Sequence, residues 1–245
     1  MPNPVFAASR LIAGMKDENG VVLIPGFYEG VKLTPQEKEI LNQVPDDPEE
    51  LGGMLGISKP EKIGATYQEA LQYPTLNIRG IKAGSTGNEV RTVIPAEVVV
   101  EIDMRLVPET PASRQIDLVR KYVIDQGYYL VRDGPTEGER AKYEKLASFN
   151  FSLGSTPFRT NYDSPMSTWL SSAVARATGK VPLRMRTTGG SQPIAPFVNT
   201  LNVPAISVRI PNPGNNIHAA NENIRVGNFL EGIQTCLSVL TQPIK

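Results

Sequence analysis

The stretch that decides the fold of the first half of the chain is Thr92–Val107, which reads TVIPAEVVVEIDMRLV. Along it apolar residues alternate with mostly polar ones, a pattern that is typical of a strand with one buried face. The apolar positions are Ala96, Val98, Val100, Ile102, Met104 and Leu106, and the opposite positions are Glu97, Val99, Glu101, Asp103, Arg105 and Val107. We therefore predict a strand over Thr92–Val107 with one face toward a core.

A β-rich run, Thr75–Ile81, precedes this strand, and a Gly/Ser/Asn turn at Gly84–Asn88 separates the two, so the runs are predicted to pair antiparallel. The run Ser113–Gln126 has apolar residues at helical spacing, and a further strand is predicted at Tyr128–Val131. Strand, strand, helix and strand predict an α+β layer, which is an antiparallel sheet with helices on one face. The edge of such a sheet offers unpaired backbone groups to a second copy, so we expect a homodimer through the sheet.

Helix-start signals mark the other elements of this half, because they pair a capping side chain with proline or glutamate in the first turn. They occur at Asn3-Pro4, at Thr34 with Glu37, in the acidic segment Asp46–Leu55, and at Thr136, whose helix is expected to run to about Leu146.

The composition shifts in the middle of the chain, and we place a domain junction near residue 160. Beyond it helices and strands alternate, which is typical of α/β layering. The expected elements are a helix from Ser164-Pro165 to Gly179, a strand Leu183–Arg186, a helix opened by Gly189-Gly190-Ser191, a strand Pro204–Ile210, and a last helix with Phe229, Ile233, Cys236, Leu237 and Leu240 on one stripe. Two strands make a thin sheet, so we interpret this part as half of a larger unit.

Composition excludes several classes of protein. The chain has 25 basic and 25 acidic residues, so no overall field attracts nucleic acid or an anionic membrane. No apolar run reaches the roughly 18 residues of a membrane helix, and the start MPNPVFAASR lacks the apolar core of a signal peptide. The single cysteine, Cys236, excludes an internal disulfide, and its apolar surroundings predict a buried thiol.

The most specialised polar residues lie in Thr187–Asn223, TTGGSQPIAPFVNTLNVPAISVRIPNPGNNIHAANEN. A Gly-Gly-Ser turn at the mouth of a helix exposes backbone N–H groups that suit an anion or a carboxylate. The same residues are also common as a plain turn with a helix cap. His218, the only histidine, follows a predicted strand end and suits a metal or acid–base role, with a surface histidine of no function as the alternative.

Four motifs follow one another in the order PTLNIRGIKAG, RTVIPAEVVVEIDMRLVP, TTGGSQP and IHAANEN. Together they resemble the aminoacylase/carnosinase-type, glutamate carboxypeptidase-like zinc metallopeptidases, which include dipeptidases, carboxypeptidases and N-acyl-amino-acid hydrolases. The resemblance covers nearly the whole chain. It implies an α+β lid or dimerisation domain over residues 1–158, and the C-terminal part of a catalytic α/β domain over residues 159–245.

The resemblance also implies roles for single residues. His218 stands at the position of a zinc ligand, and imidazole is a common one. Gly189, Gly190 and Ser191 match the loop that binds the substrate's C-terminal carboxylate.

In the same way, Arg105 and Thr92 stand where lid residues hold the substrate's carboxylate or carbonyl, a task that suits a planar guanidinium. The alternative is that Arg105 forms only an ion pair with Asp103 or Glu101, and that Thr92 is an ordinary strand residue.

The family's other ligands for its two zinc ions, and its general base, a glutamate, have no counterpart in this sequence and are expected upstream. A two-metal hydrolase needs both, so no catalytic residue is assigned and we expect the isolated chain to be inactive. The parent protein would be a zinc-dependent exopeptidase that cleaves a small peptide or acyl-amino-acid substrate. The alternative is a non-catalytic dimerisation or ligand-binding module that retains the family's shape. The compartment stays open, with the cytoplasm favoured, because any signal peptide would lie upstream.

Overall fold

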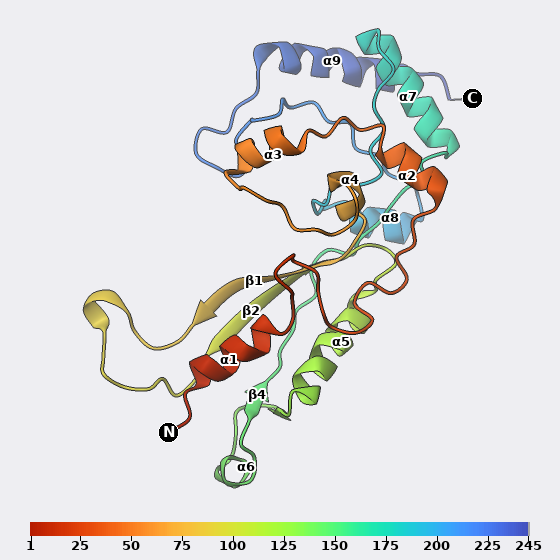
Figure 1. Ribbon diagram of the computed structural model, residues 1–245. Coiled ribbons are helices and arrows are strands. Elements are labelled where there is room, and N and C mark those ends of the chain that lie inside the picture. The colour runs from red at the N-terminus through yellow and green to blue at the C-terminus, as the bar shows by residue number, and fades with distance from the viewer. Residues whose placement is uncertain (245) are drawn as a thin grey trace. The chain divides into compact units, whose positions relative to one another are not determined.

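The computed structural model describes residues 1–244 (Figure 1). These residues fall into two units. Unit 1 consists of Met1–Pro157 with Thr187–Pro193, and unit 2 consists of Phe158–Arg186 with the residues from Ile194 onward. Unit 1 contains α1 (Pro4–Ala13), α2 (Pro35–Leu41), α3 (Pro48–Leu55), α4 (Tyr67–Ala70), β1 (Thr75–Lys82), the 3-10 turn η1 (Gly87–Glu89), β2 (Val99–Arg105), α5 (Ala112–Asp125), β3 (Tyr129–Val131), α6 (Glu137–Lys142) and β4 (Leu146–Ser148). Unit 2 contains α7 (Pro165–Thr178), α8 (Ala195–Leu201) and α9 (Val226–Leu240). Within residues 1–244, no helix has the length and apolar character that a bilayer-spanning segment needs.

The strand pair β1–β2 is antiparallel, as predicted, and Figure 1 shows it as two adjacent arrows. Thr75 pairs with Arg105 at one end and Lys82 with Val99 at the other. The prediction that the second strand starts at Thr92 is wrong, because residues 92–98 belong to the irregular connection before β2. β1 ends opposite Val99, so residues 92–98 have no partner in β1, and Pro95 among them has no N–H to donate to a ladder.

The third predicted strand forms, but it does not join this sheet. β3 pairs in parallel with β4, which begins at Leu146, where the helix from Thr136 was expected to end. That helix, α6, ends at Lys142 because Tyr143 has an extended backbone. The Tyr143 ring stacks on the Tyr129 ring with centroids 3.8 Å apart, which holds the chain after α6 beside β3.

The core of unit 1 lies where α5 and β1 meet the segment that follows α1. α5 contributes the predicted face of Ile116, Val119 and Val123, all buried. The central cluster consists of Met15, Val22, Ile24, Phe27, Leu76, Val119 and Val123. Partly buried Ile102 and Met104 of β2 pack against it, so the predicted apolar face of the strand points to the core and unit 1 is an α+β domain.

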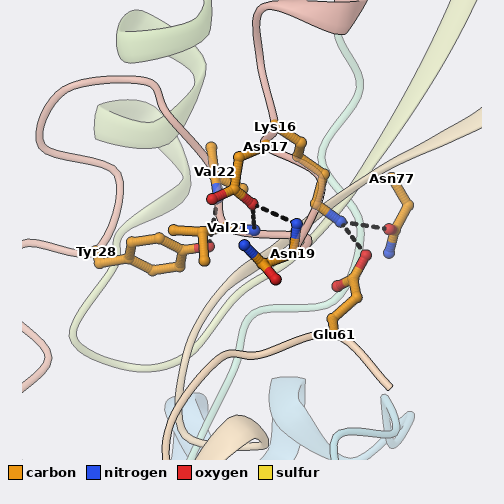
Figure 2. A network of polar contacts seen from close by, with 8 residues as sticks. All are labelled: Lys16, Asp17, Asn19, Val21, Val22, Tyr28, Glu61 and Asn77. Carbon is orange, nitrogen blue, oxygen red and sulfur yellow. Dashed lines mark hydrogen bonds and ion pairs between the residues drawn. The ribbon is translucent and has the colours of Figure 1, made fainter. Parts of the chain in front are cut away.

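A polar network fixes the turn between Met15 and Val22 (Figure 2). One Asp17 carboxylate oxygen accepts hydrogen bonds from the backbone N–H groups of Asn19 and Val21, both at 2.9 Å. The Tyr28 hydroxyl accepts from the backbone N–H of Val22 at 2.8 Å. Burial raises the pKa of Tyr28, and this hydrogen bond opposes the rise.

Lys16 links the same turn to two distant segments. Its Nζ donates to Glu61 Oε1 at 2.7 Å and to Asn77 Oδ1 of β1 at 3.3 Å. Glu61 also lies against the turn at Gly20, where a Cβ would come within 2.4 Å of the Glu61 side chain. Gly20 has φ +84°, so glycine is favoured there by both backbone conformation and space.

Unit 2 has the first and the last of the helices predicted for this half of the chain, α7 and α9, but not the predicted strands. α7 starts after Ser164, whose side chain caps it, and ends at the left-handed Gly179. Neither Leu183–Arg186 nor Pro204–Ile210 is a strand, because neither pairs with another strand within the described residues. At Ala205 a side chain replaces the ladder: the Thr160 hydroxyl accepts from the Ala205 N–H and donates to its carbonyl.

The last helix, α9, buries a different face from the apolar stripe. Its buried residues are Gly232, Thr235 and Ser238, and it packs against α7. The prediction of a buried Cys236 thiol is wrong, because the residue is exposed. The face of α9 that contacts α7 carries small residues, and the apolar stripe lies on another face of the helix.

Candidate functional site

The strongest candidate site lies at the end of β2, where Arg105 meets the Gly-Gly-Ser segment. Arg105 Nη1 donates to Ser191 Oγ at 3.1 Å, although the two residues are 86 positions apart in the chain. Both belong to unit 1, because Thr187–Pro193 is part of that unit. The fold thus brings together two residues that the sequence assigned separately to carboxylate binding.

A carboxylate orients the Arg105 side chain. Arg105 Nε donates to Asp103 Oδ2 at 2.8 Å, and Asp103 precedes Arg105 by two positions on the same face of β2. Of the two predicted partners, Asp103 is therefore the one observed. Glu101 pairs instead with Arg79 of β1, at 2.9 Å from Nη2 and 3.2 Å from Nε.

The Gly-Gly-Ser segment has the conformation of a turn. Gly189 has φ +71°, a left-handed conformation that glycine adopts without strain, and a Cβ there would come within 2.9 Å of Leu71 Cδ2. Gly190 has open space where a Cβ would be. The segment passes close to Leu71 at the end of α4, a neighbour that no sequence pattern indicated.

The expectation that Gly189-Gly190-Ser191 opens a helix is wrong. α8 begins at Ala195, and its N-cap is Ile194, which provides no side-chain cap. Pro193 and Ile194 form a turn between the serine and the helix. Ser191 is thus free to accept from Arg105 because it does not cap a helix.

Thr92 lies apart from these residues. It is exposed in the connection between β1 and β2, which extends away from the strands in Figure 1. Within residues 1–244 its hydroxyl makes no hydrogen bond to Arg105 or Ser191. The structure therefore does not assemble Thr92 with the other candidate residues.

His218 lies in unit 2, on an exposed turn in the loop before α9. Its φ of +63° is left-handed, a conformation that is uncommon for residues with a Cβ. Asn216 and Asn221 nearby are also left-handed, and asparagine tolerates this conformation. Backbone hydrogen bonds from Ala219 to Asn216 and from Asn223 to Asn215, both at 2.9 Å, close the turn and hold His218 in place.

The described residues do not fit a zinc centre on their own. Within residues 1–244 there is no group of three His, Cys, Asp or Glu side chains placed to hold a metal ion. Zinc sites in proteins use three or four such ligands. Among the described residues, His218 could supply one ligand to such a site.

Comparison with known proteins identifies the family. The family model described as "Peptidase dimerisation domain" matches residues 1–128. The Cys-Gly metallodipeptidase DUG1 of Candida albicans is 27% identical over 240 residues, which are 95% of this chain and 46% of that protein. The human Beta-Ala-His dipeptidase is 27% identical over 235 residues, 94% of this chain and 44% of that protein.

A solved structure agrees with these matches. The M20 family metallo-carboxypeptidase Sso-CP2 from Sulfolobus solfataricus aligns with a TM-score of 0.78 and 26% identity, over 99% of this chain and 53% of that one. The chain spans about half the length of the relatives it matches. With the family model matching more than half of its residues, the chain belongs to the M20 family of metallopeptidases and carries that family's peptidase dimerisation domain.

Proposed function

We propose that the complete protein is a zinc-dependent exopeptidase that hydrolyses a peptide or amide bond next to a free carboxylate, with a dipeptide or an N-acyl-amino acid as substrate. In it this chain supplies the groups that bind the carboxylate, Arg105 and Ser191. The observation that carries the proposal is the Arg105–Ser191 hydrogen bond, which joins β2 to the Gly-Gly-Ser segment. Relatives that are named dipeptidases and a carboxypeptidase support the substrate class.

The chemistry of the pair suits a carboxylate. A guanidinium donates charge-assisted hydrogen bonds in a planar fork, and a serine hydroxyl that accepts one hydrogen bond can still donate another. Arg105 is half exposed, with 56% of its side chain accessible, so a ligand can reach it. Gly189 and Gly190, which precede Ser191, carry no side chain, and the position of a Cβ at Gly190 is open space.

The test is carboxylate binding by the 245-residue chain, measured by NMR titration with N-acetylglycine. N-acetylglycinamide, which has no carboxylate, is the ligand control. Arg105→Ala is expected to weaken the binding of N-acetylglycine about tenfold or more, because it removes a charge-assisted hydrogen bond. Arg79→Ala removes an equal charge from the neighbouring strand and is expected to have little effect. Equal weakening by both variants would contradict a site at Arg105.

We further propose that residues 1–158 act as the lid and dimerisation domain, and that residues 159–245 belong to the catalytic domain, where His218 is one zinc ligand. The 245-residue chain alone is then expected to hydrolyse no dipeptide when zinc is supplied. Hydrolysis that His218→Ala abolishes would overturn this part of the proposal. Calorimetric titration with zinc, on the wild type and His218→Ala, measures whether the chain takes up the metal at all.

The proposed assembly is a homodimer through the β1–β2 sheet. The presence of a peptidase dimerisation domain supports it, and strand edges offer unpaired backbone groups to a second copy. Sedimentation velocity of the 245-residue chain tests it, and a species that remains monomeric at all concentrations would contradict it.

A further inference from the structure

The polar face of β1–β2 carries two acid–arginine pairs that differ in one respect. In the first pair, Arg79 directs both Nε and Nη2 to a single Glu101 oxygen, so its donors are turned to one acid. In the second pair, Arg105 gives only Nε to Asp103 and directs Nη1 to Ser191. The acid beside Arg105 therefore holds one edge of the guanidinium and leaves the other side for additional acceptors.

We propose that Asp103 is a positioning residue. It fixes the Arg105 guanidinium so that Arg105 Nη2 and the Ser191 hydroxyl both face the carboxylate of the ligand. This inference rests on the proposed carboxylate site. Within residues 1–244, the hydrogen bonds of Arg105 use Nε and Nη1, which leaves Nη2 for a ligand. Ser191 accepts from Arg105, so its own O–H can donate to the same ligand.

Asp103 is suited to this role because its backbone lies within the β1–β2 ladder. It lies directly opposite Asn77 in the strand pair, and the Asn77 side chain accepts from Lys16, which also binds Glu61 (Figure 2). Its side chain is 32% exposed against 56% for Arg105, so it is the more enclosed partner. An arginine that is already held in one rotamer loses less conformational entropy when a ligand binds.

Two effects of Asp103 oppose each other, and their signs make the inference testable. The negative charge of Asp103 weakens the attraction of Arg105 for an anion. Its hydrogen bond preorganises Arg105 and so strengthens binding. If charge alone mattered, removal of the acid would tighten carboxylate binding; if positioning dominates, removal weakens it.

The experiment is NMR titration of the 245-residue chain with N-acetylglycine, comparing Asp103→Ala, Asp103→Asn and the matched control Glu101→Ala. Asp103→Ala is expected to weaken binding about threefold to tenfold, the cost of ordering one free side chain. Asp103→Asn keeps an oxygen acceptor without the charge, and is expected to bind at least as tightly as the wild type. Glu101→Ala removes an equal charge next to Arg79 and is expected to leave binding unchanged or slightly tighter.

The Nε–H signal of Arg105 gives a second readout that does not depend on the ligand. Its exchange with water is expected to speed up in Asp103→Ala and to stay slow in Asp103→Asn. Binding by Asp103→Ala that equals or exceeds that of Glu101→Ala would overturn the positioning role while Arg105→Ala still weakens binding. If Arg105→Ala binds like the wild type, the proposed carboxylate site itself fails.

Discussion

Units 1 and 2 bury different kinds of residue. The interior of unit 1 contains large apolar side chains, among them Phe27, Leu41 and Leu76, each 1% exposed. In the described part of unit 2, the buried apolar residues are two alanines, Ala173 and Ala195. Burial of apolar surface stabilises a fold by about 25 cal/mol per Å². Unit 1 therefore has a core of its own, and unit 2 depends on other interactions.

α9 shows what those interactions are. Six of its seven large apolar residues are more than half exposed, and Val239 is partly buried; the six are Val226, Phe229, Leu230, Ile233, Leu237 and Leu240. The face that packs on α7 is instead held by hydrogen bonds, since the Ser238 hydroxyl donates to the Ala173 carbonyl at 2.7 Å and accepts from Arg176 Nε at 2.9 Å. An exposed apolar face of this size is unusual for a free monomer surface. Amphipathicity thus identifies a helix without telling which face is covered.

The largest effect is expected from Phe27→Ala in unit 1, and Phe229→Ala in unit 2 is its counterpart. Phe27→Ala should lower the free energy of unfolding of unit 1 by about 3–5 kcal/mol, because it leaves a cavity in the core. Phe229→Ala, at a side chain that is 54% exposed, should cost unit 2 less than about 1 kcal/mol. Urea unfolding measures both, with fluorescence of Trp169 in α7 reporting on unit 2 and amide exchange in α5 reporting on unit 1.

An equal loss of unfolding free energy in Phe27→Ala and Phe229→Ala would contradict the proposed difference between the units. Equal losses would mean that the apolar face of α9 is covered in solution. Light scattering at several protein concentrations then tells whether a second copy covers it.

A smaller effect is expected from Ser238→Ala, which removes both hydrogen bonds of that hydroxyl in the α7–α9 contact. The expected loss is about 1–3 kcal/mol, because the Ala173 carbonyl and the Arg176 Nε–H each lose one buried hydrogen-bond partner. Ser172→Ala is the control, since its exposed hydroxyl donates to the Thr168 carbonyl within α7 and makes no hydrogen bond to α9 within residues 1–244. The Trp169 signal in urea should separate the two variants. If they unfold together, hydrogen bonds do not hold this contact.

Local signals in the sequence predicted the helices well, because capping chemistry is contained in a few neighbouring residues. The side chains of Asn3, Thr34, Thr136 and Ser164 all accept the expected hydrogen bond from a backbone N–H in the first helical turn. The strands of unit 2 were not predicted correctly, because a strand exists only beside a partner. Alternating or β-rich residues at Pro204–Ile210 carry no information on whether a partner is present.

The candidate site, too, could be predicted only in part from the sequence. Arg105 and Ser191 were each assigned from their motifs, and the shared strand face indicated Asp103 or Glu101 as a partner of the arginine, of which the structure shows Asp103. The contact between Arg105 and Ser191 could not be predicted, since it depends on how the chain returns to unit 1 at Thr187–Pro193.

A further effect, about 1 kcal/mol, is expected from Tyr122→Phe in unit 1, which removes the hydrogen bond from Tyr122 to the Leu11 carbonyl and so loosens α1 from α5. Burial raises the pKa of Tyr122, so the folded state holds the phenol proton more tightly than the unfolded state. The contribution of the protonated Tyr122 phenol to the free energy of unfolding is therefore fully present below about pH 10, the usual tyrosine pKa. It is lost as the pH rises above that value.

Urea unfolding of unit 1 between neutral and alkaline pH measures this dependence. The wild type should lose stability above about pH 10, and Tyr122→Phe should lose less over the same range. Tyr28 also has a raised pKa, so some alkaline loss should remain in the variant. Identical slopes for the two proteins would show that Tyr122 ionises equally in both states.

The smallest effect belongs to α6, a helix of unit 1 that buries no residue and is stabilised by its capping box. The Thr136 backbone N–H and hydroxyl both donate to Glu139 Oε2 at 2.8 Å, which lowers the pKa of Glu139, the backbone N–H more than the hydroxyl. Because the pKa of Glu139 is lowered in the folded helix, the ionised carboxylate stabilises α6 at pH values above about 4.3, the usual glutamate pKa. This stabilisation is lost as the pH falls through the pKa of Glu139 in the folded state. Thr136→Ala removes only the hydroxyl, so an NMR titration of Glu139 should show its pKa return part of the way. The free energy of unfolding of unit 1 should be the same in Thr136→Ala as in the wild type, because α6 buries no residue in the core. A lower free energy of unfolding in the variant would mean that local helix caps stabilise unit 1 as well as the side chains around Phe27.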